Sequence, residues 1–326
     1  MWIYILRRLL YAIPILIGVN LLTFFLFFIV NAPADMARVS LGEKHVTPKA
    51  IDNWIENHGY NKPLFLNTTQ TGKYIFTDTL FFEKTWKLFL FDYGISDGGR
   101  DITQDISERF GPSLSIAIPA LFFEVFLNIV LALIIVFFRR TFVEMTGVIV
   151  LVAMMSISAL FYIITGQYLI GKLFNWVPIS GYENGLFSFK FVILPIFVSV
   201  IASFGSGARW YRTLLLEEMN QDYIRTARAK GLSNVRVLFV HALKNAMIPI
   251  LTGIVVLIPS LFMGSLLLES FFSIPGLGSY TIDAIAAQDF AVVRSMVFLG
   301  SFLYIIGLLL TDISYMLVDP RIRFNR

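Results

Sequence analysis

Long apolar runs alternate with polar segments along the whole chain. The runs are Leu9–Val30, Ser113–Phe138, Thr146–Ile170, Phe191–Gly207, Met247–Leu268 and Ser295–Leu317. A helix of roughly 20 apolar residues can cross a bilayer, and none of these runs contains a lysine or an arginine. The pattern therefore predicts an all-α integral membrane protein with six transmembrane helices.

The composition agrees with this prediction. The 326 residues are 57% hydrophobic and 15% charged, whereas a soluble domain has about 25% charged residues. The chain has no cysteine and three scattered histidines, His45, His58 and His241. Disulfides and thiolate chemistry are therefore excluded, and a metal site is not expected. We expect the lipid bilayer as surroundings and no nucleic-acid partner.

Basic residues between the runs predict the orientation. They gather in Arg7-Arg8, Arg139-Arg140, Arg209–Lys244 and Arg321–Arg326, which alternate with the spans so that all four lie on one side. Arginine and lysine in short loops mark the cytoplasmic side. We therefore expect both termini in the cytoplasm and the long Asn31–Gly111 segment on the opposite side.

The pattern divides the chain into three parts: a signal-anchor helix (1–30), a periplasmic segment (31–112) and a five-helix core (113–326). The alternative for the first part is a cleaved signal peptide, because Ala32-Pro33-Ala34 resembles a cleavage site. The first run is longer than the core of about 7–15 residues typical of signal peptides, which favours an anchor. In the second part, Thr47 and Pro48 predict the start of an amphipathic helix.

A polar island, Arg209–Val237, interrupts the apolar core. Met219, Tyr223 and Ala227 are four residues apart, which predicts that they share a helix face. The helical pattern continues to Lys230, and Gly231 is typical of a helix stop. The sequence therefore predicts a helix, a glycine break and a second helix on the cytoplasmic surface, within a loop at about 209–245.

Two functions are open for this island. An amphipathic helix can rest on anionic lipid headgroups, or it can dock on a soluble protein. Lipid anchors need bulky apolar residues, whereas Ala227, Ala229 and Gly231 provide little bulk. This difference favours docking on a protein.

Ionisable residues inside spans are costly and often functional. Glu124 lies in the middle of the second run, and Asn128 follows one turn later on the same face. One interpretation is a purely structural pair at a helix interface. The other is a transport pathway in which Glu124 meets the amine of a substrate.

The segment Asp222–Ser233 resembles the cytoplasmic "EAA" loop of ATP-binding-cassette (ABC) importer permeases. More narrowly, it resembles the peptide/nickel permease family of oligopeptide and dipeptide importers, in which the run continues into a stretch like His241–Asn245. Arg225 and Thr226 stand where the general motif has Glu-Ala, and Lys244 stands where many permeases have proline. Both departures are usual in the peptide subfamily.

Three further stretches carry the same resemblance. They are Ile5–Leu10, Glu269–Gly278 and Asp312–Arg323. The resemblance covers the chain from end to end and is least specific in Asn31–Gly111. It implies the type I ABC importer permease fold, with a long periplasmic segment between helices 1 and 2.

The resemblance implies a transport subunit for peptides in the inner membrane and not an enzyme. Its partners would be a second homologous permease, two cytoplasmic ATPases and a periplasmic substrate-binding protein. The chain contains no phosphate-binding Gly-x-x-x-x-Gly-Lys-Ser/Thr motif. We therefore expect it to bind no cofactor, with ATP and magnesium held by the ATPases. The expected coupling residues are Tyr223, Arg225, Thr226, Ala227, Arg228, Ala229, Lys230, Gly231 and Leu232.

The resemblance also places Glu269, Pro275 and Gly276 near the outer mouth of the pathway, beside the candidates Glu124 and Asn128. A permease for nickel or another small solute is the alternative within the family. The absence of histidine from the predicted spans favours peptides, because nickel sites favour imidazole. An ion-coupled secondary transporter and an intramembrane enzyme are the alternatives from other classes.

Overall fold

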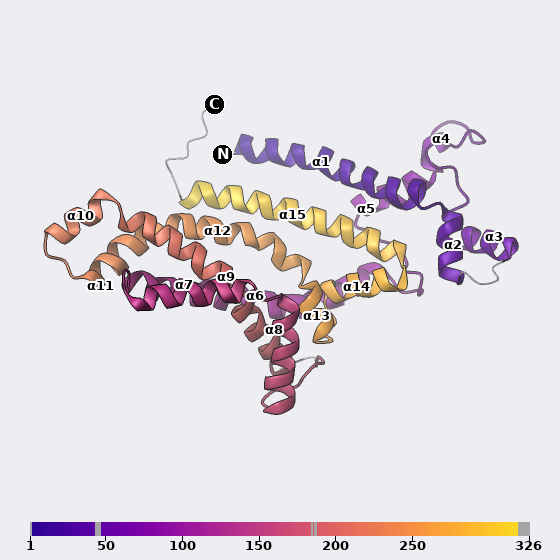
Figure 1. Cartoon of the computed structure of the whole chain (residues 1–326). Helices are drawn as coiled ribbons and strands as arrows, with labels where there is room; N and C mark the ends of the chain where they lie inside the picture. The colour runs from indigo at the N-terminus through magenta and orange to yellow at the C-terminus, as the bar shows by residue number, and fades with distance from the viewer. Residues whose placement is uncertain (1, 43–46, 184, 186–187, 319–326) are drawn as a thin grey trace. The chain divides into compact units, whose positions relative to one another are not determined.

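The computed structural model describes residues 2–42, 47–183, 185 and 188–318 (Figure 1). The C-terminal Arg321–Arg326, used above for orientation, lies outside these residues. The first half contains α1 (Trp2–Phe25), the π-helical η1 (Leu26–Val30), α2 (Pro33–Leu41), α3 (Pro48–Asn57), α4 (Tyr74–Thr77), η2 (Phe82–Trp86), α5 (Lys87–Phe89) and α6 (Ile102–Phe137). In the described residues this fold is helical, apart from an isolated bridge between Ile95 and Asp101.

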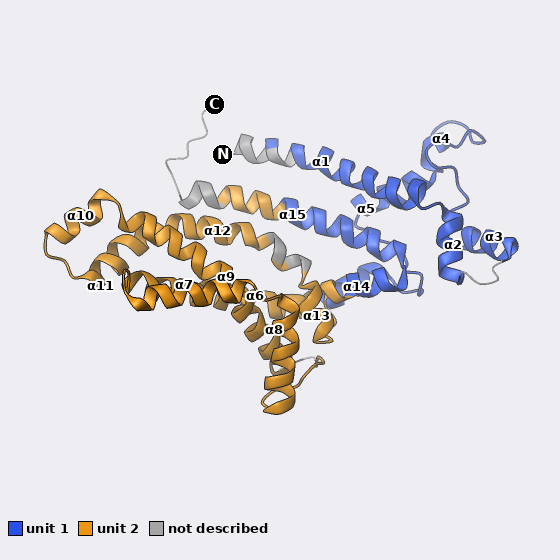
Figure 2. Cartoon of the chain, in the orientation of Figure 1, with its two compact units in different colours: residues 1–109, 280–305 blue, residues 110–279, 306–326 orange. Residues whose placement is uncertain are grey.

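The second half is also helical. It contains α7 (Phe142–Met155), α8 (Ala159–Gly166), η3 (Gln167–Leu173), α9 (Phe189–Met219), α10 (Asp222–Ala229), α11 (Asn234–Arg236), η5 (Val237–Ala242), α12 (Leu243–Met263), α13 (Leu266–Phe271), α14 (Leu277–Ala287) and α15 (Phe290–Val318). Contacts divide the chain into two compact units (Figure 2). Unit 1 is 1–109 with 280–305, and unit 2 is 110–279 with 306–326.

Five helical segments in the described chain are long and apolar enough to cross a membrane: Leu10–Val30, Ile102–Phe137, Phe189–Met219, Asn234–Ile258 and Phe290–Ile313. A bent pair, Phe142–Met155 with Ala159–Leu173, makes a sixth if it counts as one span. The prediction of an all-helical membrane protein is confirmed, and the described residues contain five or six candidate spans where the sequence predicts six.

The predicted third span, Thr146–Ile170, is not one helix. Its two halves meet at an angle of 91°. Ser158 explains the break, because its backbone is extended and its hydroxyl accepts a hydrogen bond from the backbone N–H of Leu160 at 3.3 Å. A serine in this position begins a new helix.

Two other predicted boundaries also differ from the structure. The fourth span does not stop at Gly207, because α9 continues through Arg209 and Arg212 to Met219. The predicted fifth span runs through a break, since α12 ends before Gly264, whose φ of 70° is unfavourable for other residues. The remainder of that apolar run belongs to α13.

Unit 1 packs the end of the first span against the segment that follows it. Phe24 and Phe28 form its core with Met36, Trp54 and other residues; the full buried set is Phe24, Phe28, Met36, Ala37, Trp54, Tyr60 and Leu80. Thr47 accepts a hydrogen bond from the backbone N–H of Ala50 at 3.3 Å, so the predicted start of α3 is confirmed. The apolar face of α3 is therefore fixed against the end of α1.

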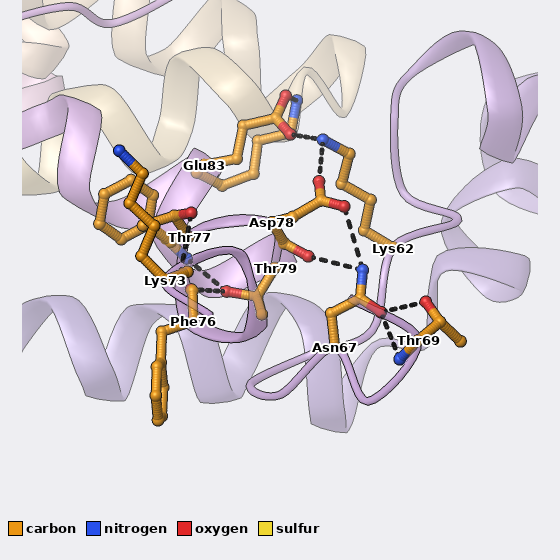
Figure 3. A network of polar contacts seen from close by, with 11 residues as sticks. Lys62, Asn67, Thr69, Lys73, Phe76, Thr77, Asp78, Thr79 and Glu83 are labelled. Carbon is orange, nitrogen blue, oxygen red and sulfur yellow. Dashed lines mark hydrogen bonds and ion pairs between the residues drawn. The ribbon is translucent and has the colours of Figure 1, made fainter. Parts of the chain in front are cut away.

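An ion-pair network closes the loop between α3 and η2 (Figure 3). The Lys62 ammonium lies 2.9 Å from Asp78 and 2.8 Å from Glu83. Hydrogen bonds to these two carboxylates raise the pKa of Lys62. Asn67 donates to the Asp78 carboxylate at 3.0 Å, and its own oxygen accepts from the Thr69 hydroxyl. Polar contacts therefore hold this loop together with the apolar contacts of Tyr60 and Leu80, which belong to the core of unit 1.

Candidate functional site

Helix α10 lies beside α11 at one end of unit 2 (Figure 1). Ile224 and Ala227 point into a core that also contains Leu215, Leu238 and Ala242. Ile224 is 0% exposed and Ala227 is 6% exposed. The remaining residues of α10 are exposed. The helix is therefore attached by one apolar face and presents a polar face outward.

The end of α10 is a complete Schellman motif. The N–H of Leu232 donates to the carbonyl of Ala227 at 3.3 Å, and the N–H of Gly231 donates to that of Arg228 at 2.9 Å. Gly231 has a φ of 78°, which glycine adopts without strain. Ser233 then begins α11 by accepting from the N–H of Arg236. The predicted helix, glycine break and second helix are confirmed.

The outward face of α10 carries polar and charged groups. The Tyr223 hydroxyl donates to the carboxylate of Glu218. Burial raises the pKa of Tyr223, and the Glu218 carboxylate raises it further, so the phenol remains a donor. Arg225 lies 3.2 Å from Asp222, a weak exposed pair. Arg228 extends the positive charge of this face.

One prediction for this helix is wrong. Met219 does not share a helix face with Tyr223 and Ala227, because α9 ends at Met219 and a turn separates it from α10. Tyr223 is 37% exposed, whereas Ala227 faces the core. Ile224 is the anchoring residue that the sequence analysis missed. Its spacing of three residues from Ala227 is the signal that could have identified it.

The end of α6 supports the same region. Arg139 donates to the Asn220 side chain at 3.3 Å, which ties the α6–α7 connection to the turn before α10. Glu144 accepts from the backbone N–H of Arg140 and also pairs with Arg212 of α9. Movement of α10 would therefore be transmitted to the ends of α6, α7 and α9.

Two adjoining cavities lie within unit 2. The larger, about 510 Å³, is lined by Leu121, Glu124, Val125, Asn128, Ser203, Ser206, Gly207, Trp210, Tyr211, Gly253, Val256 and Leu257. The smaller, about 260 Å³, runs from Glu124 to Glu269 and includes Ser113 and Ser199. Glu124 lines both cavities. The larger volume falls within the range of small-molecule sites.

Glu124 and Asn128 face the same region, as the sequence analysis predicts. The Ser199 hydroxyl donates to Glu124 at 2.5 Å, and Asn128 donates to the Ser203 hydroxyl at 2.9 Å. Asn128 is 2% exposed, and its side-chain oxygen has no partner in the described part of the chain. Both side chains therefore retain hydrogen-bonding capacity toward the cavity.

Two glycines shape the larger cavity. A Cβ atom on Gly253 would lie 2.1 Å from the indole ring of Trp210, and one on Gly207 would lie 2.6 Å from the Asn128 amide. Glycine at these positions lets Trp210 and Asn128 approach the backbone of the neighbouring helix. The sequence analysis did not identify these three wall residues, Trp210, Gly207 and Gly253.

Glu269 lies at the far end of the smaller cavity and is 1% exposed. Its carboxylate accepts from the Ser113 hydroxyl at 2.9 Å and from the N–H groups of Ser265, Gly278 and Ser279 at 3.0, 2.7 and 3.1 Å. Burial raises the pKa of Glu269, and these donors offset part of the rise. The carboxylate thus organises the chain reversal between α12 and α14.

The neighbouring glycines allow the chain to pack closely around the Glu269 carboxylate. A Cβ atom on Gly276 would lie 2.2 Å from a Glu269 oxygen, and one on Gly264 would lie 2.5 Å from the other oxygen. Gly276 and Pro275 are absent from the described residues that line the two cavities. The structure therefore brings Glu124, Asn128 and Glu269 to the cavities. It places the buried Gly276 in the packing behind Glu269 and leaves Pro275 exposed.

The chemistry of this region fits binding better than catalysis. Among the described residues, no group of three or more His, Cys, Asp or Glu side chains could hold a metal ion. The cavity walls combine aromatic and aliphatic side chains with one carboxylate, one amide and several hydroxyls. Such a wall can contact a small polar solute without reacting with it.

Known proteins are similar to this chain over almost its full length. The family described as "binding-protein-dependent transport system inner membrane component" matches residues 1–324. A putative peptide transport system permease protein of Brucella abortus (strain 2308) is 32% identical over 328 residues, which cover 98% of this chain and 99% of the relative. The dipeptide transport system permease protein DppB of Escherichia coli (strain K12) is 31% identical over 351 residues, 99% of each chain.

A relative from Bacillus subtilis extends the comparison. The oligopeptide transport system permease protein AppB of Bacillus subtilis (strain 168) is 30% identical over 335 residues, 98% of this chain and 99% of the relative. The match of the family and of these relatives includes both the α10 segment and the cavity helices. This chain belongs to the family of binding-protein-dependent transport system inner membrane components.

Proposed function

We propose that the chain is the transmembrane permease subunit of an ABC importer that moves di- or oligopeptides across the bacterial inner membrane. The observation that carries this proposal is the full-length similarity to permeases named for peptide, dipeptide and oligopeptide transport. The subunit would have six spans of the type I fold, with both termini in the cytoplasm and residues 31–112 outside. It would pair with a second homologous permease and receive substrate from a periplasmic binding protein.

Helix α10 supports a role in coupling. Its exposed face would seat in a groove of a cytoplasmic ATPase, which binds the ATP and magnesium. Tyr223, Arg225, Thr226, Arg228, Ala229 and Lys230 are the contact residues in this proposal. The buried Ala227, the Gly231 stop and Leu232 would instead hold the helix in place, so that ATPase closure moves α9 and α12 through their shared core.

The two cavities support a transport pathway through unit 2. Glu124 lies where they adjoin, with its carboxylate near aromatic and amide groups. A carboxylate at membrane depth is suited to a peptide's N-terminal ammonium group. Substrate would then pass from the Glu269 end toward the α10 end.

The coupling role can be tested on the assembled complex with its ATPases. Ala229→Trp places a bulky ring on the exposed face of α10 without disturbing the core. We expect co-purification of the ATPases and ATP-dependent dipeptide uptake to fall by about tenfold or more, as at an interface hot spot. Asn53→Trp on the exposed face of α3 is the matched control and should leave both unchanged. Normal uptake by Ala229→Trp would contradict the docking role.

Gly231→Pro tests how the helix is held. Proline fixes φ near −65°, whereas Gly231 has a φ of 78°, so the cap would be lost. We expect ATP hydrolysis without proportionate uptake, or loss of the ATPases from the complex.

Parallel uptake assays with nickel in place of a dipeptide would separate the proposed substrate from the family alternative.

A further inference from the structure

Unit 1 contains a polar cavity of about 420 Å³ that the proposed pathway does not use. It is formed by the end of α3, η2 and α5, the 92–99 loop and the first turn of α15, and its charged lining residues are Glu83, Lys84, Lys87, Asp92, Asp97 and Arg294. The same wall includes the imidazole of His58 and the phenol rings of Tyr60 and Tyr93. Burial raises the pKa of Tyr93 to about 12, so its hydroxyl remains a neutral donor.

Arg294 is the unusual member of this wall. Its side chain is only 6% exposed. In the described part of the chain its Nε has no hydrogen-bond partner, and its guanidinium carbon lies 5.7 Å from the centre of the Phe28 ring. A buried charge without a partner costs several kcal/mol, by order of magnitude. An anionic ligand would satisfy a guanidinium held in this way.

The nearby carboxylates are engaged elsewhere. Glu83 pairs with Lys62 at 2.8 Å, as Figure 3 shows. Asp97 lies 3.5 Å from the His58 ring, and its backbone N–H donates to Asp289 at 2.9 Å. These groups act on Arg294 through space at most, so its N–H donors remain open to a ligand.

A second cation crowds the same cavity. Burial lowers the pKa of Lys84, and the charge of Arg294 lowers it further. On the acidic side, burial and the neighbouring Asp289 carboxylate raise the pKa of Asp97. Opposite charges already act across the cavity, since Glu83 lies 4.0 Å from Lys84 and the charges of Arg294 and Lys84 lower the pKa of Asp97 in part. A bound molecule that carries both charges would add a counter-charge to each side. A ligand with a carboxylate at one end and an ammonium at the other supplies both.

We propose that this cavity binds a small zwitterion of the amino acid or short peptide class, with its carboxylate held by Arg294 and Lys84 and its ammonium facing Asp97. Arginine binds carboxylates through two parallel hydrogen bonds, and the volume suits a small molecule. The choice of a peptide as ligand rests on the proposed function, whereas the charge recognition does not. The site is separate from the Glu124 cavity, because every residue lining it belongs to unit 1.

The test measures binding of dialanine to the assembled complex in lipid nanodiscs by calorimetry, without ATP and without the binding protein. We expect dialanine to bind and its C-terminal amide to bind about 10–100-fold more weakly, which is the value of a charged hydrogen bond. N-acetyl-dialanine tests the ammonium in the same way. Equal affinity for dialanine and its amide would overturn the proposal. Binding of an acidic protein partner in place of dialanine would also overturn it.

Arg294→Met separates a ligand-binding arginine from a structural one. The variant removes the buried charge but keeps most of the volume, so we expect dialanine affinity to fall at least tenfold while Tm stays unchanged or rises. Arg294→Lys should recover part of the affinity. Lys84→Gln should weaken binding by a smaller factor, and the exposed Lys73→Gln is the neutral control. A lower Tm with unchanged dialanine affinity in Arg294→Met would assign Arg294 a structural role.

This outcome is distinct from failure of the proposed function. Dialanine binding that persists in Arg294→Met would belong to another site, such as the Glu124 cavity, and would overturn only the inference about unit 1. Absence of dipeptide uptake by the wild-type complex with its binding protein would instead contradict peptide transport. Binding and uptake are therefore measured on the same preparation.

Discussion

Glu124 and Glu269 are two carboxylates in unit 2 with different surroundings. Glu269 accepts four hydrogen bonds from within the chain and is surrounded by glycines. Within the described residues Glu124 accepts a hydrogen bond from Ser199, and it lines two cavities. A carboxylate whose acceptors are filled stabilises the fold, whereas one with open capacity can meet a solute. Burial alone therefore does not identify a pathway residue.

The largest expected effect comes from removing Glu269. Glu269→Ala leaves three backbone N–H groups and the Ser113 hydroxyl without their acceptor in a buried site. Each buried unsatisfied group costs about 1–3 kcal/mol, so we expect the free energy of unfolding to fall by at least about 3 kcal/mol. The measurement is thermal unfolding and yield of the complex in nanodiscs. If Glu269→Ala kept the wild-type Tm, Glu269 would not have the structural role that distinguishes it from Glu124.

Gly276→Ala tests the packing behind Glu269 while keeping the carboxylate. Its new Cβ atom would lie 2.2 Å from a Glu269 oxygen and 2.5 Å from the Ser113 hydroxyl. Overpacking of this kind costs about 1–3 kcal/mol. The matched control is Gly18→Ala in α1, where no atom outside its own helix lies within 4 Å of the added carbon. Equal Tm values for the two variants would show that the packing around Glu269 has room for an added methyl group.

Local sequence signals predict some of these regions and not others. Thr47, Gly231 and Ser233 were predicted correctly because a helix start or stop depends on adjacent residues. The Ser113–Glu269 bond joins residues 156 positions apart, and no spacing rule reaches that far. The sequence could therefore identify Glu124 as a costly charge, and the family resemblance could single out Glu269, but neither could show which of them has its acceptors filled.

The same limit explains the regions that were missed. The Arg294 cavity is built from α3, η2, α5, the 92–99 loop and the start of α15, which are separated along the chain, so its residues share no motif. Arg294 lies just before the last predicted span, where a basic residue does not indicate a buried site. Ile224 has a different reason, since the four-residue spacing that joins Met219, Tyr223 and Ala227 crosses the end of α9 at Met219.

A pair of serine variants compares the two carboxylates directly. Ser113 donates to Glu269 and also accepts from the N–H of Leu277 at 2.8 Å. Ser113→Ala therefore disrupts two buried interactions, and we expect a loss of about 1–3 kcal/mol. Ser199→Ala removes a single donor from Glu124, beside a cavity, and should cost less than about 1 kcal/mol. Thermal unfolding of both variants in one preparation checks the order, and a reversed order would contradict it.

Glu124→Gln should have the smallest effect on stability and a selective effect on transport. Glutamine keeps the size of the side chain and can still accept from Ser199, so Tm should change by less than the Ser113→Ala shift. If Glu124 meets the substrate ammonium, loss of its charge removes about 1.5–3 kcal/mol of interaction, and dipeptide uptake at low substrate concentration should fall about 10–100-fold. N-acetyl-dipeptide uptake, which lacks the ammonium, should be nearly equal in wild type and variant. A large Tm loss with unchanged uptake per folded complex would instead place Glu124 with Glu269 as a structural carboxylate.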